Sequence, residues 1–164
     1  MSTDDREDNL PGQGNPALKP LTVLVGEWEI ELSHASFLPN PSDTVKGLVS
    51  FERVQDGAFL LMRMGDKPPS PPNALWLIGR DDSTSDYTVL YYDARGVSRV
   101  YAMSFSADGL WKMWREAPGF WQRYEGTVSP TGTKVTARWE KSYDDGATWE
   151  LDFHMTYTKS AKVS

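Results

Sequence analysis

A two-residue alternation of apolar and polar side chains, broken at short intervals by turn residues, dominates this chain. Directly after Gly26, the apolar Trp28, Ile30 and Leu32 alternate with glutamates. Such alternation is typical of a β-strand with one buried and one exposed face. Clusters of Gly, Pro, Asn and Asp then recur about every 8–12 residues, a spacing found in β-sandwiches and β-barrels. The pattern therefore predicts an all-β protein.

We expect ten strands, the first of which starts after Gly26. The other nine lie near residues 44–54, 58–65, 74–80, 87–92, 97–105, 110–116, 120–128, 133–142 and 149–159. Most connections are too short to hold a crossover helix, so neighbouring strands should form antiparallel hairpins in up-and-down order. Closing the sheet removes its exposed edges. The sequence thus predicts a ten-stranded antiparallel up-and-down β-barrel.

The start of the chain differs from the rest. Residues 1–15 are rich in acidic side chains and nearly devoid of apolar ones, so nothing offsets the entropy lost on ordering them. We expect a disordered acidic leader there, followed by a single barrel domain over residues 16–160. Leu18, Leu21 and Leu24 recur at helical spacing, which predicts one short helix near residues 17–25.

Composition and charge exclude several classes of function. The chain has 164 residues and no cysteine, which excludes disulfides, thiolate catalysis and Cys-ligated metal sites. With two histidines and no third ligand near them, we expect no metal site. A net charge of −6 argues against a nucleic-acid partner. No apolar run approaches the ~20 residues of a membrane span, and the acidic start does not resemble a signal peptide. We expect a cytoplasmic protein without nucleic-acid or membrane partners.

Aromatic residues are frequent enough to line an internal pocket: the chain has seven Trp and seven Tyr. Bulky side chains also fill barrel cores, and strands favour them in any case. Some eight-stranded barrels hold one small ligand, however, and ten strands enclose more volume. We therefore predict a cavity for a small hydrophobic or amphipathic molecule. The candidate ligand-binding residues are Trp28, His34, Tyr101, Trp114, Arg115, Arg123, Asp152 and His154.

Two arginines fall on strands joined by a tight turn. Arg115 and Arg123 could together form a cationic spot for a ligand carboxylate, because the guanidinium group binds carboxylates with two parallel hydrogen bonds. The alternative is cross-strand pairing with Glu116 and Glu125, which is worth only ~0.2–1 kcal/mol per exposed pair.

His154 shares one face of the last strand with Asp152 and Thr156. The opposite face, which includes Phe153 and Met155, is more apolar, so the alternation predicts that His154 points outward. A polar barrel interior would reverse this orientation, and His154 with Asp152 could then serve a hydrolase or a natural-product cyclase. The chain has no Gly-x-Ser-x-Gly elbow, and we assign no catalytic residue.

A short segment near the C-terminus resembles the Asp-box, a hairpin motif of proteins that include sialidase propellers. It reads Ser142-x-Asp144-x-Gly146-x-Thr148-Trp149. In that motif the Asp side chain caps turn amides, Gly adopts a positive φ and Trp packs beneath the turn. We interpret the single copy as a folding device rather than as a sign of glycosidase chemistry.

Both ends of the chain resemble the nitrobindins, which are haem-binding barrels of the calycin type. The matching features at the start are Asn15-Pro16, a helical turn and Gly26-x-Trp28. At the end, the matching feature is the strand LDFHMTYTK. Phrases between them, such as WREAPGFWQRYEG, resemble an uncharacterised bacterial family of calycin-like barrels. The resemblance implies a barrel similar to lipocalins and fatty-acid-binding proteins.

The nitrobindin terminal strand carries a haem-ligating histidine, and in our alignment that position is Asp152. The glycine-rich stretch that follows Gly-x-Trp in nitrobindins is also replaced by EIELSHASFLPN. A carboxylate is a poor substitute for an imidazole on haem iron. We therefore expect neither haem nor another cofactor.

Three functions remain open on the sequence. The first is a binding barrel for a small apolar or mixed-polarity molecule, of unknown physiological role. The second is an enzyme on the same barrel that uses His154 and Asp152, and the third is a haem protein. A homodimer built through an exposed sheet face is a further alternative, since antiparallel barrels often associate in this way.

Overall fold

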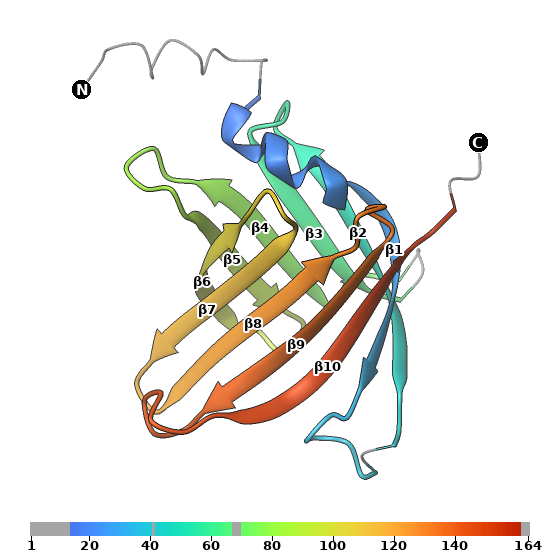
Figure 1. Cartoon of the computed structure of the whole chain (residues 1–164), viewed down its shortest axis with the longest axis vertical. Helices are drawn as coiled ribbons and strands as arrows, with labels where there is room; N and C mark the ends of the chain where they lie inside the picture. Colours follow the sequence, from blue (N-terminus) through green and yellow to red (C-terminus); the bar gives the residue numbers. More distant parts are fainter. Residues whose placement is uncertain (1–13, 41, 67–69, 162–164) are drawn as a thin grey trace.

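The computed structural model describes residues 14–40, 42–66 and 70–161 (Figure 1). They form one short helix and ten strands. The elements are η2 (Pro16–Leu24), β1 (Gly26–Ser33), β2 (Val45–Val54), β3 (Phe59–Gly65), β4 (Ala74–Arg80), β5 (Tyr87–Asp93), β6 (Ser98–Phe105), β7 (Leu110–Ala117), β8 (Phe120–Val128), β9 (Lys134–Ser142) and β10 (Glu150–Lys159). Most of the predicted leader, residues 1–13, lies outside the described residues.

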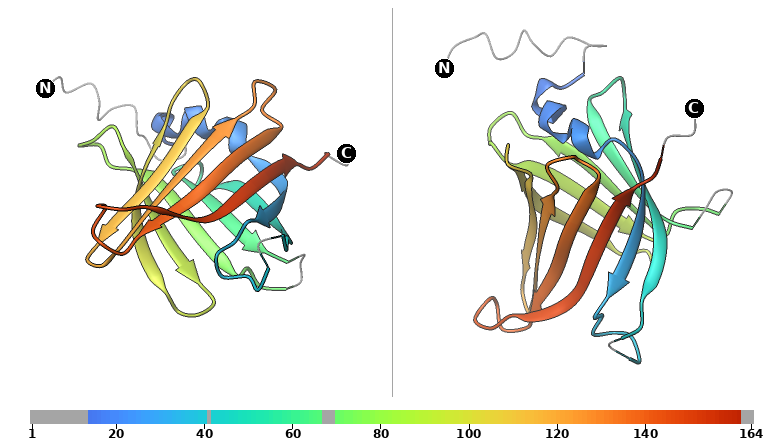
Figure 2. Two further views of the ribbon diagram at one scale, coloured as in Figure 1. Left: turned by 60° about the horizontal axis from the view of Figure 1, so that its bottom comes forward. Right: turned by 45° about the vertical axis from the view of Figure 1, so that its right-hand side comes forward.

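The strands form a closed antiparallel barrel, as the sequence predicts. Each strand pairs with its neighbours in the chain, and β1 pairs with β10 to close the sheet. Two further views show the strands running around the whole circumference, with η2 lying across one end (Figure 2). Closure pairs the edge strands that an open sheet would expose. No helix among the described residues is long and apolar enough to span a bilayer.

The predicted helix is a 3₁₀ helix rather than an α-helix. Asn15 caps it, since its side-chain oxygen accepts the backbone N–H of the residue two positions later at 3.0 Å. A 3₁₀ helix has three residues per turn, so side chains three apart lie on one face. Leu18, Leu21 and Leu24 have this spacing, and all three are buried. The helix thus covers one end of the barrel with a row of leucines.

Hydrogen bonds attach η2 to the barrel. The indole nitrogen of Trp28 donates to the backbone oxygen of Leu24 at 2.8 Å, and the hydroxyl of Tyr87 donates to that of Ala17 at 2.6 Å. Fully buried side chains of Trp28, Trp111 and other core residues fill the interior next to the helix. This end is therefore closed, and any internal space must lie toward the other end.

The hairpin between β9 and β10 has the bonding expected of an Asp-box. The Asp144 carboxylate accepts the backbone N–H of Thr148 at 2.8 Å and its hydroxyl at 2.5 Å, and it also accepts the Ser142 hydroxyl at 2.8 Å. Gly146 has a φ of +85°. The indole beside this glycine belongs to Trp121 of β8, because a Cβ on Gly146 would lie 2.5 Å from its ring.

Candidate functional site

The barrel encloses a cavity of about 380 Å³ at the end opposite η2. Its lining includes Leu32 near the end of β1 and Ala74 and Phe120 at the starts of β4 and β8. These positions lie far from η2, because β1 begins directly after the helix and the strands alternate in direction. Ligand pockets commonly measure ~300–1,000 Å³, so this cavity is large enough for a small molecule.

Aromatic rings form much of the cavity wall. The Trp76 ring lies 4.4 Å from that of Tyr91, 5.5 Å from that of Tyr101 and 6.0 Å from that of Trp139 between centroids. All four of these residues line the cavity. Trp76 is 7% exposed, and its indole N–H has no hydrogen-bond partner among the described residues. A buried donor without a partner costs free energy.

A polar cluster lies at the open end. Gln122 is 8% exposed, and its amide oxygen accepts the Tyr101 hydroxyl at 2.8 Å and a guanidinium N–H of Arg99 at 3.3 Å. Burial raises the pKa of Tyr101, while the charges of Arg99 and Arg115 act in the opposite direction. The phenol therefore remains a hydrogen-bond donor at neutral pH.

Arg95, another residue of the cavity lining, is neutralised within its own turn. Its guanidinium donates to the Asp93 carboxylate at 2.7 Å, and the Tyr91 hydroxyl donates to the same oxygen, also at 2.7 Å. These bonds from Arg95 and Tyr91 hold the pKa of Asp93 well below its ordinary value. The turn between β5 and β6 is thereby tied to the cavity wall.

Asp152 lines the cavity because a β-bulge interrupts β10. The register with β9 shifts between Leu151 and Phe153, so Asp152 is the additional residue. Its carboxylate accepts the Ser36 hydroxyl at 2.9 Å and lies 3.5 Å from the Lys141 ammonium. Burial lowers the pKa of Lys141, but the Asp152 carboxylate and the Tyr143 side chain together outweigh burial, so the pKa of Lys141 is raised.

The structure distributes the eight candidate residues over several places. Tyr101 and Asp152 line the cavity. Trp28 is buried under η2 at the closed end. His34 is exposed in the loop after β1, at a φ of +53°. Trp114 lies on the outer face of β7, since its neighbour Met113 points into the cavity.

The predicted cationic spot of Arg115 with Arg123 is wrong. The register pairs Arg123 with Trp114 and pairs Arg115 with Gln122, so the two arginines face opposite sides of the sheet. Arg123 lies outside, where it bonds to Glu140 at 3.0 Å and stacks on the Trp149 ring at 3.9 Å. The alternative pairing with Glu116 and Glu125 is not formed among the described residues either, because Arg123 pairs with Glu140 of β9 and Arg115 forms no ion pair.

Neither histidine lies in the cavity. His154 alternates with the buried Met155 and so lies on the outer face of β10, as the sequence predicts. Its ring contacts that of His34 edge-on, with 5.2 Å between centroids. The expectation that Asp152 shares its face is wrong because of the bulge. The cavity thus offers no imidazole to haem iron, and a catalytic pair of His154 with Asp152 would have to act across the sheet.

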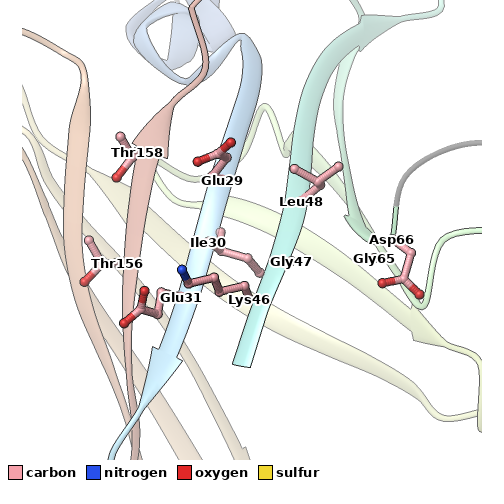
Figure 3. Close-up of a pocket in the computed structure, with 10 residues that line it drawn as sticks. All are labelled: Glu29, Ile30, Glu31, Lys46, Gly47, Leu48, Gly65, Asp66, Thr156 and Thr158. Carbon is pink, nitrogen blue, oxygen red and sulfur yellow. The ribbon is translucent and has the colours of Figure 1, made fainter. Parts of the chain in front are cut away.

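Among the described residues, no three His, Asp or Glu side chains lie close enough together to hold a metal ion. A larger hollow of about 590 Å³ lies on the outer surface of β1, β2 and β10 (Figure 3). Its charged side chains, such as Glu29, Glu31 and Lys46, are exposed. We therefore regard the interior cavity as the candidate site.

Sequence reasoning missed Arg99 and Gln122 as site residues. The sequence nevertheless indicates the inward orientation of both residues. Gln122 has the same strand parity as the buried Tyr124 and Val128, and Arg99 has the same parity as Tyr101. A polar residue at an inward position of a barrel strand indicates either a buried network or a ligand contact.

Comparisons with known proteins support the fold. No family model matches the chain, and no curated protein sequence matches it. Among solved structures, it is similar to Rv2717c from M. tuberculosis, with a TM-score of 0.59. The match covers 90% of this chain and 99% of that chain, at 11% sequence identity. At this identity the similarity concerns the barrel architecture.

Proposed function

We propose that this protein is a binding barrel for a small molecule of mixed polarity. The observation that carries the proposal is the cavity of about 380 Å³, which combines an aromatic wall with buried polar groups at its open end. An apolar pocket with a few convergent polar groups is the usual form of a small-molecule site. The Tyr101 and Gln122 side chains supply such groups.

We also propose that the chain is a calycin-like barrel related to the nitrobindins. The sequence resemblance at Asn15-Pro16, Gly26-x-Trp28 and the last strand supports this assignment. The closed ten-stranded sheet and the similarity to Rv2717c agree with it at the level of the barrel. A cytoplasmic location, the absence of cofactor, nucleic-acid and membrane partners, and a homodimer as an alternative stay predictions from the sequence.

A titration with 1-anilinonaphthalene-8-sulfonate tests the binding function. We expect saturable binding at about one probe per chain, with quenching of tryptophan emission, because the cavity wall contains Trp76 and Trp139. Ala74→Phe should block binding, since Ala74 lines the cavity. Ala102→Phe is the matched control, because Ala102 alternates with the buried Tyr101 and Met103 and so faces outward.

Two results would contradict the binding function. One is the absence of saturable binding by the natural protein. The other is unchanged binding by Ala74→Phe in a protein that melts as the natural one does.

A further inference from the structure

Three charged residues line the cavity: Arg95, Arg99 and Asp152. Two of them have partners of opposite charge, because Arg95 bonds to Asp93 at 2.7 Å and Asp152 lies 3.5 Å from Lys141. Arg99 forms no ion pair within the described parts of the chain. The cavity therefore contains one positive charge that no carboxylate of the described residues neutralises.

The contacts of Arg99 leave most of its hydrogen-bonding capacity unused. Within the part of the chain that the structure describes, its side chain makes one hydrogen bond, to the Gln122 oxygen at 3.3 Å, and lies 5.6 Å from the Phe120 ring centroid. A guanidinium has five N–H donors and no acceptor. The bond also fixes the orientation of Gln122, because only the amide oxygen can face Arg99. The hydrogen bonds described for Gln122 use only this oxygen, so its NH₂ group is a second donor in the cluster.

Arg115 adds positive charge beside this cluster. It pairs with Gln122 across β7 and β8, and its charge acts on the Tyr101 phenol. Like Arg99, it forms no ion pair in the described ranges. The protein carries a net charge of −6, so this part of the cavity differs in sign from the molecule as a whole. Salt screens charges that lie more than about 8–10 Å away, so nearby arginines affect a bound group more than the distant acidic residues do.

We propose that the natural ligand is an aromatic carboxylate whose carboxylate binds Arg99 and the Gln122 amide, while its ring lies against the wall formed by Trp76, Tyr101 and Trp139. The inference rests on the proposed binding function and specifies its ligand class. The guanidinium group favours carboxylates because it binds them with two parallel hydrogen bonds. Aromatic ligands suit the wall, since rings pair at centroid distances of ~4.5–7 Å. A neutral ligand would leave the positive charge of Arg99 without a partner.

Isothermal titration calorimetry with matched probes tests this ligand class. Benzoate, 2-naphthoate and 9-anthracenecarboxylate offer three ring sizes, and the corresponding primary amides lack the charge. For the ring size that fits, we expect the acid to bind about 10- to 100-fold more tightly than the amide, as for other hydrogen bonds to charged groups.

Gln122→Glu is the decisive variant. Glutamate has nearly the same shape and keeps acceptors for Tyr101 and Arg99, but its carboxylate would neutralise Arg99 internally. The preference for the acid should fall to less than about threefold, a loss of most of the 10- to 100-fold difference. Gln55→Glu adds the same charge in the exposed loop between β2 and β3 and should leave the preference unchanged.

Arg99→Met provides a second test that does not depend on the Gln122 substitution, and Arg138→Met on the outer face is its charge-matched control. We expect Arg99→Met to lose the acid preference and Arg138→Met to retain it. If an amide binds the natural protein as tightly as its acid, the carboxylate inference is overturned while the binding function stands. If none of the six probes binds, the carboxylate inference is overturned, and the titration with 1-anilinonaphthalene-8-sulfonate decides separately whether the binding function stands.

Discussion

The Tyr101 hydroxyl on β6 donates a 2.8 Å hydrogen bond to the Gln122 amide oxygen on β8, so the bond reaches across the intervening strand β7. Both side chains are buried, at 2% and 8% exposure. A satisfied buried hydrogen bond fixes the positions of its two groups. The wall of the cavity is therefore held in place before any ligand binds, which lowers the entropic cost of binding.

The indole of Trp28 should stabilise the protein through its hydrogen bond as well as through burial of its ring. Its N–H bonds to the Leu24 oxygen at 2.8 Å, whereas the N–H of the equally buried Trp111 has no partner in the described ranges. We expect Trp28→Phe to cost about 1–3 kcal/mol more than Trp111→Phe, because only the first leaves a buried carbonyl unpaired. Urea unfolding of both variants measures the difference. Equal losses would contradict the account of how η2 is attached.

Gly146 should tolerate no side chain. An added Cβ would lie 2.5 Å from the Trp121 ring, and the φ of +85° is unfavourable for other residues. Gly96 has a similar φ of +82° but no atom within 4 Å of its Cβ position. Gly96→Ala should thus show the backbone cost alone, of about 1–3 kcal/mol. We expect Gly146→Ala to lower the melting temperature further than Gly96→Ala does, and the reverse order would refute the packing against Trp121.

The Asp-box should make the stability of the folded protein depend on pH under acidic conditions. Hydrogen bonds from Thr148, and then from Ser142, lower the pKa of Asp144 from its ordinary 3.8 to about 2. The folded protein therefore binds this proton less tightly than the unfolded chain. The stability that Asp144 contributes is present above about pH 3.8 and is lost as the pH falls toward 2.

Comparison with Asp144→Asn isolates this effect, because all other acidic groups are shared. We expect the natural protein to melt at a higher temperature than Asp144→Asn at pH 5, and the gap to narrow as the pH approaches 2. A gap that does not change with pH would show that the Asp144 carboxylate does not hold the hairpin.

We expect the natural protein not to bind haem specifically. Its two histidines lie outside the cavity, and the aligned position holds Asp152. Titration with hemin should give no sharp one-to-one Soret band. Asp152→His would place an imidazole at a cavity-lining position and should move the spectrum toward haem binding. A stoichiometric Soret band of the natural protein that disappears in His154→Ala would overturn this prediction.

The barrel could be predicted from the sequence because alternation and turn residues act locally. Trp28, Ile30 and Leu32 mark the inner face of β1 without reference to other strands. The type of helix was harder to predict, although the three-residue spacing from Leu18 to Leu24 fits a 3₁₀ helix better than an α-helix.

The site could be predicted only in part, because strand faces depend on single-residue shifts. One bulge turns Asp152 into the cavity while His154 stays outside. Likewise, the register of β7 with β8 separates Arg115 from Arg123. A shift of one residue moves every following side chain to the opposite face of the sheet. Nothing in the local sequence indicates such a shift.

Methyl NMR of the methionines tests the central claim most directly. Of the six methionines, Met62, Met64, Met113 and Met155 line the cavity, whereas the buried Met103 does not. On titration with 1-anilinonaphthalene-8-sulfonate, the aromatic ring should shift the four lining methyl signals at a single saturating stoichiometry. The signal of the buried Met103 should move far less. Saturation that leaves the four lining signals in place, or that shifts Met103 as much as them, would contradict binding in the barrel cavity.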